Sequence, residues 1–209
     1  MPTPLRLLSV DARPFGRDRA ALARFIADAG VDVACVHGGP HLLRWRSISA
    51  AVGRRAGLVV VTGGRTGGAN LVLSTLGVDV LAVEDVLLTG GLDQSRVRLI
   101  RPGAALAALR LRGAEFVVAS ATLVGNAAER LVQARELQTA IDQLVPADLP
   151  AVISAEGADR PGTSAWQALV ENRVGVAGRI FVDGRLSLSD AAQLPGRTPA
   201  GAVLLTLDL

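Results

Sequence analysis

The sequence lacks lysine and tyrosine, and it has only one cysteine, two histidines and an aromatic fraction of 3%. All 22 side chains in the Lys and Arg total are therefore arginines, and 19 Asp and Glu residues leave a net charge of +3. The isoelectric point near 10.7 reflects the very high pKa of arginine rather than a strongly basic surface. An excess of three charges is too small to indicate a nucleic-acid partner, and we expect none.

Long apolar runs and paired cysteines are also absent. The longest apolar candidate is interrupted by Asp79, Glu84 and Asp85, so no segment reaches the roughly 20 residues of a membrane span, and we expect no membrane association. The first residues lead directly into a strand-like run that ends at Asp11, which is not the pattern of a signal peptide. The single Cys35 excludes an intrachain disulfide and predicts a cytoplasmic protein. The Ala, Gly and Arg bias is typical of a GC-rich bacterial genome.

The sequence does contain enough apolar material for one substantial core. With 209 residues and a 50% hydrophobic composition, we expect one domain over 1–209 rather than two. Short apolar runs predict strands at 5–10, 31–36, 57–62, 70–76, 78–88, 96–101, 104–111, 115–123, 150–156, 179–182 and 202–207. Amphipathic segments predict helices at 18–29, 42–53, 126–144 and 163–172. This order indicates an α/β fold with two layers of sheet.

The most informative segment is 150–166, which reads PAVISAEGADRPGTSAW. An apolar run leads to Glu156, a Gly-Ala-Asp-Arg-Pro-Gly turn follows, and Trp166 comes after it. This layout resembles the endonuclease/exonuclease/phosphatase superfamily, the metal-dependent phosphodiesterases and phosphomonoesterases related to DNase I. The corresponding loop of that family reads roughly Gly-Asp-Phe-Asn. In this sequence Glu156 stands for the Asp and Ala158 for the Asn.

Further motifs of the resemblance recur in the right order along the chain. The first strand ends at Asp11, where the family has an Asn that contacts phosphate or metal. The second ends in the pair His37-Gly38, where the family has Gln-Glu and the Glu is the main metal ligand. In FVVASATL, Thr122 replaces the catalytic His of the family's Thr-His-Leu.

The resemblance continues to the last strand of the chain. Gly178, in GRIFV, stands where the family has an Asp, and Pro199 and Ala200 stand at the positions of its Asp-His pair. The whole set implies a DNase I-like fold, a four-layer α-β-β-α sandwich with two packed mixed β-sheets.

The chemistry of that family makes these replacements interpretable. Phosphoester hydrolysis needs cations to neutralise the phosphoryl oxygens, a base to activate water, and donors that hold the phosphate. Gly38, Ala158, Gly178, Pro199 and Ala200 supply none of these groups. Loss of one such group commonly costs on the order of 10²–10⁴ in rate. The resemblance therefore implies a pseudoenzyme without a cofactor, whose scaffold is retained to bind an unidentified protein or a small anionic ligand.

An alternative function remains open, that of a divergent phosphodiesterase or phosphatase. Asp11, His37 and Glu156 remain at positions that face the ancestral pocket, and two carboxylates can suffice for an Mg²⁺ ion that keeps most of its water. The simpler interpretation is that the two carboxylates cap or hydrogen-bond adjacent turns. A zinc site built on His37 and His41 is disfavoured because Gly-Gly-Pro lies between them.

Other patterns have simple structural interpretations. The glycine-rich 63–68, GGRTGG, lacks the Lys-Ser/Thr of a P-loop and predicts a hairpin turn. Trp166 is expected to anchor the core beneath the Glu156 loop, and Trp45 to offer an exposed contact. The densest positive cluster predicts a solvated helix face, or else a face that binds an anion or an acidic partner; its members are Arg44, Arg46, Arg54 and Arg55.

Ser120 and Ser154 have no histidine near them in sequence, so a serine hydrolase is disfavoured. A third hypothesis is a pure interaction module that docks through an exposed apolar or arginine-rich face.

Overall fold

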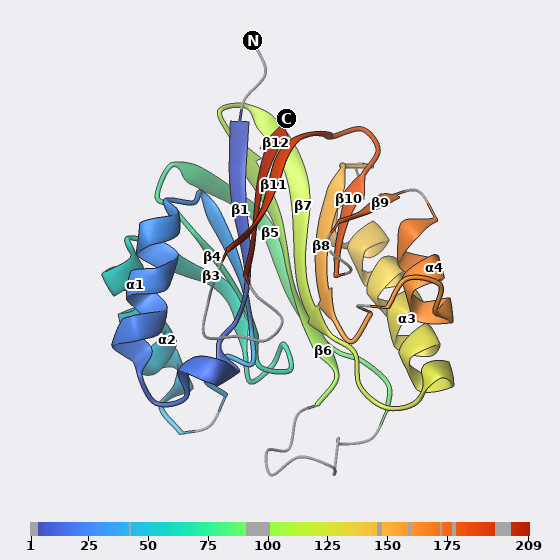
Figure 1. Cartoon of the computed structure of the whole chain (residues 1–209), viewed down its shortest axis with the longest axis horizontal. Helices are drawn as coiled ribbons and strands as arrows, with labels where there is room; N and C mark the ends of the chain where they lie inside the picture. The colour runs from blue at the N-terminus through green and yellow to red at the C-terminus, as the bar shows by residue number, and fades with distance from the viewer. Residues whose placement is uncertain are drawn as a thin grey trace.

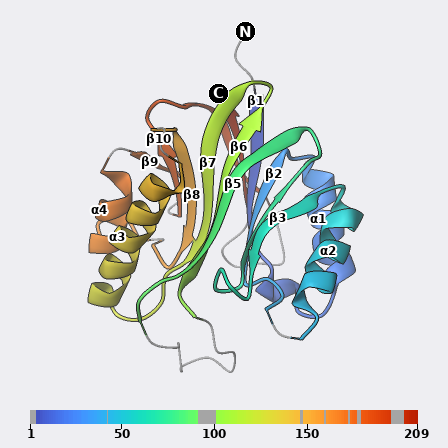
Figure 2. The same ribbon diagram turned by 180° about the vertical axis from the view of Figure 1, so that it is seen from behind.

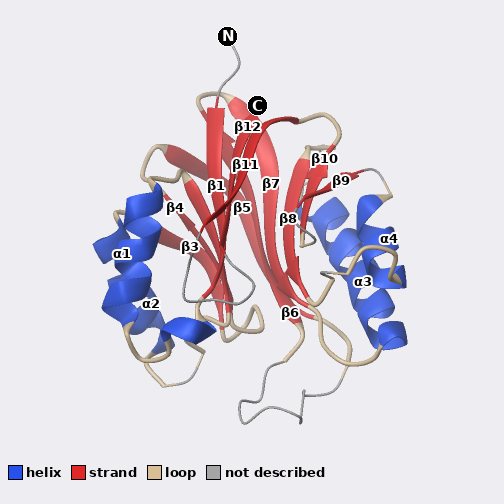
Figure 3. Ribbon diagram, in the orientation of Figure 1, coloured by secondary structure: helices blue, strands red, loops and turns tan. Residues whose placement is uncertain are grey.

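The computed structural model describes residues 4–41, 43–90, 101–145, 148–158, 160–171, 173–176, 179–194 and 202–209. These residues form two six-stranded mixed sheets packed face to face, with helices on the outer face of each sheet (Figure 1). Figure 3 shows the helices of the two outer layers separated by the paired sheets. The predicted four-layer α-β-β-α sandwich is therefore confirmed.

The first sheet has the strand order β11-β12-β1-β2-β4-β3. Its central strands β1 and β2 are parallel, and its other pairings are antiparallel. The strands are β1 (Pro4–Asp11), β2 (Val33–His37), β3 (Val59–Gly64), β4 (Asn70–Ser74), β11 (Ser187–Leu194) and β12 (Ala202–Asp208).

The second sheet repeats this plan in the order β5-β6-β7-β8-β10-β9. Here β7 and β8 are the parallel pair. The strands are β5 (Val78–Leu87), β6 (Gly103–Leu111), β7 (Ala114–Thr122), β8 (Ala151–Glu156), β9 (Arg173–Val176) and β10 (Ile180–Asp183). Parallel strands require a crossover connection, so each parallel pair has a helix between its strands and ends at one common edge.

The crossover helices begin at well-defined caps. Helix α1 (Arg19–Ala29) joins β1 to β2, and the Asp18 carboxylate accepts a hydrogen bond from the Ala21 amide at its N-terminus. Helix α3 (Ala127–Leu144) joins β7 to β8 and begins with a capping box between Asn126 and Glu129. Such caps satisfy amide groups that the first turn leaves free. The other helices are α2 (Trp45–Ala56), α4 (Ser164–Val170) and the 3₁₀ helix η1 (Arg13–Phe15).

Strand alternation distributes the apolar residues over three buried layers. Leu5 and Leu7 of β1 point between the sheets, whereas Leu8 and Val10 point toward the helix layer of α1 and α2. Phe116 of β7 is fully buried in the layer between the sheets. The layer beneath α3 and α4 is formed in the same way by the opposite faces of β7 and β8. The period of two along each strand thus fixes which layer a side chain joins.

The structure differs from the sequence-based expectation in several elements. The helix expected at 42–53 spans Trp45–Ala56, and strands β9 and β11 were not expected. β11 is a mostly exposed edge strand and β9 has only four residues, so neither contains the apolar run by which strands were sought. Of the strand expected at 96–101, all but the last residue lies outside the described residues, and that residue is not in a strand.

The edges of the two sheets meet on one side of the molecule. β3 and β5 lie beside each other there (Figure 2), and the Thr62 hydroxyl donates to the Asp85 carboxylate at 2.7 Å. The segment 63–68 forms the end of β3 and the turn into β4, which confirms the predicted hairpin. Within the described ranges, no helix is long and apolar enough to cross a membrane.

Candidate functional site

The polar groups of the candidate site lie at the ends of the two parallel strand pairs. Side chains that point between the sheets are apolar over most of β1, β2, β7 and β8 but polar near the strand ends. Because these strands end at one common edge of the sandwich, their last inward-pointing side chains come together. They are Ser9, Asp11, His37, Asn70, Ser120, Thr122, Ser154 and Glu156, with Asn70 supplied by the neighbouring β4.

The innermost of these residues form one hydrogen-bonded chain across both sheets. His37 Nε2 lies 2.7 Å from Ser154 Oγ, which lies 2.8 Å from Ser9 Oγ. His37 Nδ1 lies 3.0 Å from Asn70 Oδ1, which also accepts a hydrogen bond of 2.8 Å from Thr122 Oγ1. Each sheet contributes to the chain, so this polar layer ties the two halves of the sandwich together.

The orientation of Asn70 determines the tautomer of His37. Asn70 Nδ2 donates to the carbonyl oxygens of Gly67 and Gly103, at 2.8 and 3.0 Å. Its Oδ1 is therefore the atom that faces His37, and it can only accept. The imidazole accordingly carries its hydrogen on Nδ1, and Nε2 accepts from the Ser154 hydroxyl.

Burial keeps this imidazole neutral. His37 is fully buried, and its pKa is lowered from 6.5 to about 4, chiefly by burial and then by the positive charge of Arg179. The hydrogen bond to Asn70 acts in the opposite direction but does not outweigh burial. A neutral His37 with both nitrogens engaged has no lone pair available for a metal ion.

Ser154, His37 and Asn70 have the connectivity of a nucleophile, a base and an orienting group. His37 is 117 residues from Ser154 in sequence, so the argument that no histidine accompanies this serine did not anticipate the contact. All three residues nevertheless have no exposed surface. A substrate carbonyl cannot reach the Ser154 hydroxyl, and the arrangement serves as a buried polar network.

Closer to the rim, Asp11 and Glu156 share one arginine. Arg13 Nε lies 2.9 Å from Asp11 Oδ1, and Arg13 Nη2 lies 2.8 Å from Asp11 Oδ2. The same Nη2 forms an ion pair with Glu156 Oε1, which comes from the other sheet. The Arg13 amide also donates to Asp11 Oδ1 at 2.9 Å, so the turn after β1 holds the side chain in place. Arg13 was not predicted to be a site residue from the sequence.

The absence of a side chain at Gly38 leaves the space that Arg13 uses. Gly38 has a φ of +62°, and a Cβ at this position would lie 2.5 Å from Arg13 Cγ. A residue with a side chain here would be strained and would displace the arginine. Glycine at position 38 and arginine at position 13 are thus structurally linked.

The charges at the rim are only partly compensated. Burial raises the pKa of Glu156 above its usual 4.5, while Arg13 lowers it and Asp11 raises it. Burial acts to lower the pKa of Arg13, but the hydrogen bond to Asp11 and the charge of Glu156 outweigh it and raise that pKa. Arg13 is therefore a fixed cation between two carboxylates.

These residues do not fit the divalent ion that the resemblance implies. Mg²⁺ prefers several oxygen ligands in near-octahedral geometry. Both Asp11 oxygens and Glu156 Oε1 are bound to Arg13, Gly38 has no side chain, and both nitrogens of His37 are engaged. Among the described residues there is no group of three His, Cys, Asp or Glu side chains placed to hold a metal. Asp11, His37 and Glu156 are therefore not arranged as one set of ligands in the described part of the chain.

The remaining candidates have other contacts or lie outside the described residues. Thr122 is bound to Asn70, and Ala158 is fully buried in the layer beneath α3 and α4. His41 Nδ1 lies 3.1 Å from the Gly39 carbonyl and does not share a partner with His37. The positions Gly178, Pro199 and Ala200 lie outside the described residues.

The two tryptophans have structural contacts. Trp45 is half-buried against Gly64 rather than an exposed contact, and the Arg46 guanidinium lies 4.6 Å from its ring centre. Trp166 packs edge-on against Phe181, with ring centres 6.2 Å apart, and belongs to the layer of α3 and α4. The four clustered arginines at positions 44, 46, 54 and 55 are all exposed.

The fold of the chain is similar to that of several solved structures, whereas its sequence is not closely similar to theirs. Neither a protein-family model nor a curated protein matches the sequence. Among solved structures, an endonuclease/exonuclease/phosphatase from Bacteroides vulgatus is similar with a TM-score of 0.74 and 14% identity, covering 99% of both chains. The human Nocturnin catalytic domain with bound sulfate has a TM-score of 0.74 and 13% identity, covering 99% of this chain and 93% of its own. A mannosyl-6-phosphatase from Bacteroides thetaiotaomicron has a TM-score of 0.69 and 14% identity over 98% of each chain. The chain thus has the DNase I-like fold.

Proposed function

We propose that the chain is a catalytically degenerate member of the endonuclease/exonuclease/phosphatase superfamily, in which an arginine occupies the electrostatic role of the divalent ion. The single observation that carries this proposal is the placement of Arg13 between Asp11 and Glu156, across the backbone of Gly38. An internal cation compensates part of the charge of the two carboxylates without a metal. It also places a side chain where a phosphate ester would otherwise meet that metal.

The buried histidine supports the same conclusion. A general base needs a lone pair within reach of the water that it activates. His37 has no exposed surface, and its Nε2 already accepts from Ser154. The alternative, a divergent hydrolase built on Asp11, His37 and Glu156, requires all three to reorient, and we favour it less for that reason.

The role of the retained scaffold is then binding, of a partner protein or a small anionic ligand. We place this protein in the cytoplasm, where the single buried thiol of Cys35 is protected.

The experiment is a hydrolysis assay on the full chain with Mg²⁺ or Mn²⁺. The substrates are p-nitrophenyl phosphate, bis-p-nitrophenyl phosphate, a sugar 6-phosphate and single-stranded DNA. Asp11→Asn and Glu156→Ala variants, purified identically, measure the contribution of contaminating phosphatases. We expect equal and negligible rates for all three proteins. Metal-dependent turnover that the wild type shows and Glu156→Ala abolishes would overturn the proposal.

A further inference from the structure

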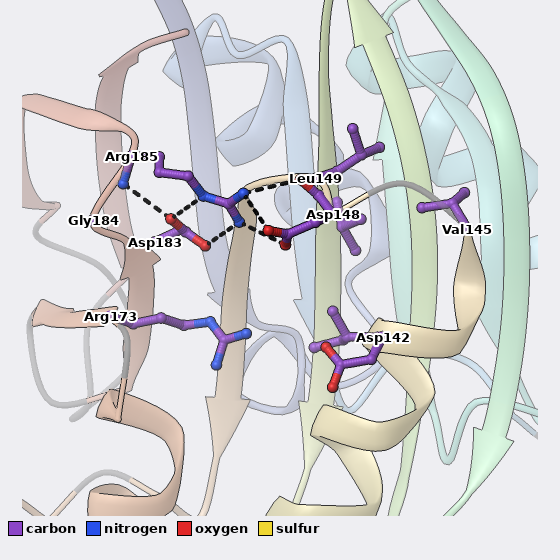
Figure 4. A pocket seen from close by; sticks show the side chains of 10 residues that line it. Asp142, Val145, Asp148, Leu149, Arg173, Asp183, Gly184 and Arg185 are labelled. Carbon is purple, nitrogen blue, oxygen red and sulfur yellow. Dashed lines mark hydrogen bonds and ion pairs between the residues drawn. The ribbon is translucent and has the colours of Figure 1, made fainter.

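A polar cavity lies at the end of the second sheet opposite to the rim of Asp11 and Glu156. It has a volume of about 640 Å³, within the range of small-molecule sites. Its wall is formed by the end of α3, the segment before β8, the start of β9 and the turn after β10 (Figure 4). Val117 lies near the start of β7, whereas Thr122 ends that strand, so this cavity is separate from the rim of Asp11 and Glu156.

One arginine of the cavity has its charge already engaged. Arg185 forms hydrogen bonds of 2.9 and 2.8 Å with the two carboxylate oxygens of Asp183. It also contacts the carboxylate of Asp148 at 3.1 Å and the Asp148 carbonyl at 2.9 Å. Figure 4 shows this ion-pair cluster on one side of the cavity. Arg185 is therefore part of the cavity wall, and its guanidinium has few donors left for hydrogen bonds to a ligand.

The second arginine lacks such partners. Arg173 points into the cavity from β9 (Figure 4), and its buried Nε has no hydrogen-bond partner among the residues that the structure describes. Burial lowers its pKa, and the charges of Asp183 and Asp142 raise it but do not offset burial. A half-buried guanidinium without a hydrogen-bonded anion is costly and is favoured where a ligand supplies the missing acceptor.

Four apolar side chains also line the cavity, on the side where Asp142 and Asp148 lie (Figure 4). They are Val117, Ile141, Val145 and Leu149. A ligand that satisfies Arg173 would place its remaining surface against these side chains and gain from their burial.

We propose that this cavity binds a small monoanionic carboxylate with a short apolar body, and that Arg173 is its anchor. The planar fork of a guanidinium matches a carboxylate in bidentate geometry. Asp142, Asp148 and Asp183 also line the cavity and repel anions, so a ligand with one negative charge is disfavoured less than a phosphate dianion. This inference is independent of whether the other end of the sandwich is catalytic.

The test is a titration of the ¹⁵N-labelled full chain with hexanoate, followed by NMR. Hexanamide and inorganic phosphate are the comparison probes. We expect saturable shifts in the amides of Ile141 and Leu149 with hexanoate, and at least roughly tenfold weaker binding of hexanamide, which cannot form a charged pair. The Nε–H resonance of Arg173 should move with hexanoate in the wild type, which reports on the anchor without a substitution.

Two variants separate a specific site from general attraction to positive charge. Arg173→Gln should weaken hexanoate binding by roughly tenfold or more, with its thermal unfolding followed to verify the fold. Arg24→Gln on the exposed face of α1 removes the same charge far from the cavity and should leave the affinity unchanged. Equal binding of hexanamide, unchanged affinity in Arg173→Gln, tighter binding of phosphate, or the absence of saturable shifts would each overturn the proposal.

Discussion

Removal of the Arg13 guanidinium is the most direct perturbation of the candidate site. In Arg13→Met the aliphatic stem over Gly38 is largely kept, while Asp11 and Glu156 lose their shared cation. Two unit charges 4 Å apart interact by about 4 kcal/mol at an effective dielectric constant of about 20. Desolvation of the ion pairs in the wild type offsets part of this.

The exposure of the three side chains sets the expected magnitude. Arg13, Asp11 and Glu156 have side-chain exposures of 22%, 10% and 23%. Removing one partner of a fully buried pair costs about 3–5 kcal/mol, so this partly buried set should lose about 2–3 kcal/mol of unfolding free energy at pH 7. Arg110→Met is the control, because its ion pair with Glu115 is 43% and 35% exposed and should cost less than about 1 kcal/mol.

The pH dependence of the loss identifies its origin. Arg13 lowers the pKa of Glu156, which burial has raised above 4.5, so that pKa rises further in Arg13→Met. A carboxylate with a raised folded-state pKa destabilises the fold when it is ionised, and this penalty disappears as the pH falls toward the unfolded value. The deficit relative to wild type should therefore shrink between pH 7 and about pH 5.

Urea unfolding at several pH values measures both quantities. A deficit no larger than that of Arg110→Met, or one that does not change with pH, would refute the assignment of Arg13 as the internal cation. Addition of Mn²⁺ provides a second observation. Only Arg13→Met has unpaired carboxylates that can bind the ion, so Mn²⁺ should raise the urea midpoint of this variant and not that of the wild type.

Three further predictions concern the same end of the sandwich. The pKa of His37 is about 4 in the folded state against 6.5 in the unfolded state, so the neutral ring's contribution to the free energy of unfolding is present above pH 6.5 and is lost as the pH falls toward 4. This loss, about 3 kcal/mol, should be absent in His37→Gln. ¹⁵N NMR should show a neutral ring with its hydrogen on Nδ1 at pH 6. Gly38→Ala should cost more than Gly57→Ala in urea unfolding, because both have positive φ but only the former Cβ meets a neighbour; equal costs would contradict the packing of Arg13. Asn70→Ala should cost about 3 kcal/mol or more by leaving His37 and Thr122 without their acceptor, and a loss below about 1 kcal/mol would show that water replaces the amide.

The sequence contained most of the fold because strand and helix periodicity is local. Of the misplaced elements, β11 has a polar, exposed sequence and depends on pairing with β12, which periodicity cannot reveal. The start of α2 at Trp45 is similarly decided by the left-handed conformation of Arg44, a backbone feature without a sequence signal here.

The candidate site was only partly accessible to the same reasoning. Resemblance located Asp11, His37 and Glu156 at strand ends, and the structure places all three at one end of the sandwich. It did not identify Arg13, Asn70 or Ser154 as their partners. Asn70 at the start of a strand and Arg13 two residues after an acidic strand end were available as signals, but neither is specific on its own.

The sequence by itself determined the α/β pattern with two layers of sheet and the absence of a ligating side chain at Gly38 and Ala158. Only the tertiary structure decided that Arg13 spans to Glu156, 143 residues away, and that His37 meets Ser154 across the sheets. The direction of a side chain follows from the local backbone period, whereas its partner depends on how two separately formed sheets pack. Burial and neighbouring charge, which set the pKa values of His37 and Glu156, arise only once that packing is complete.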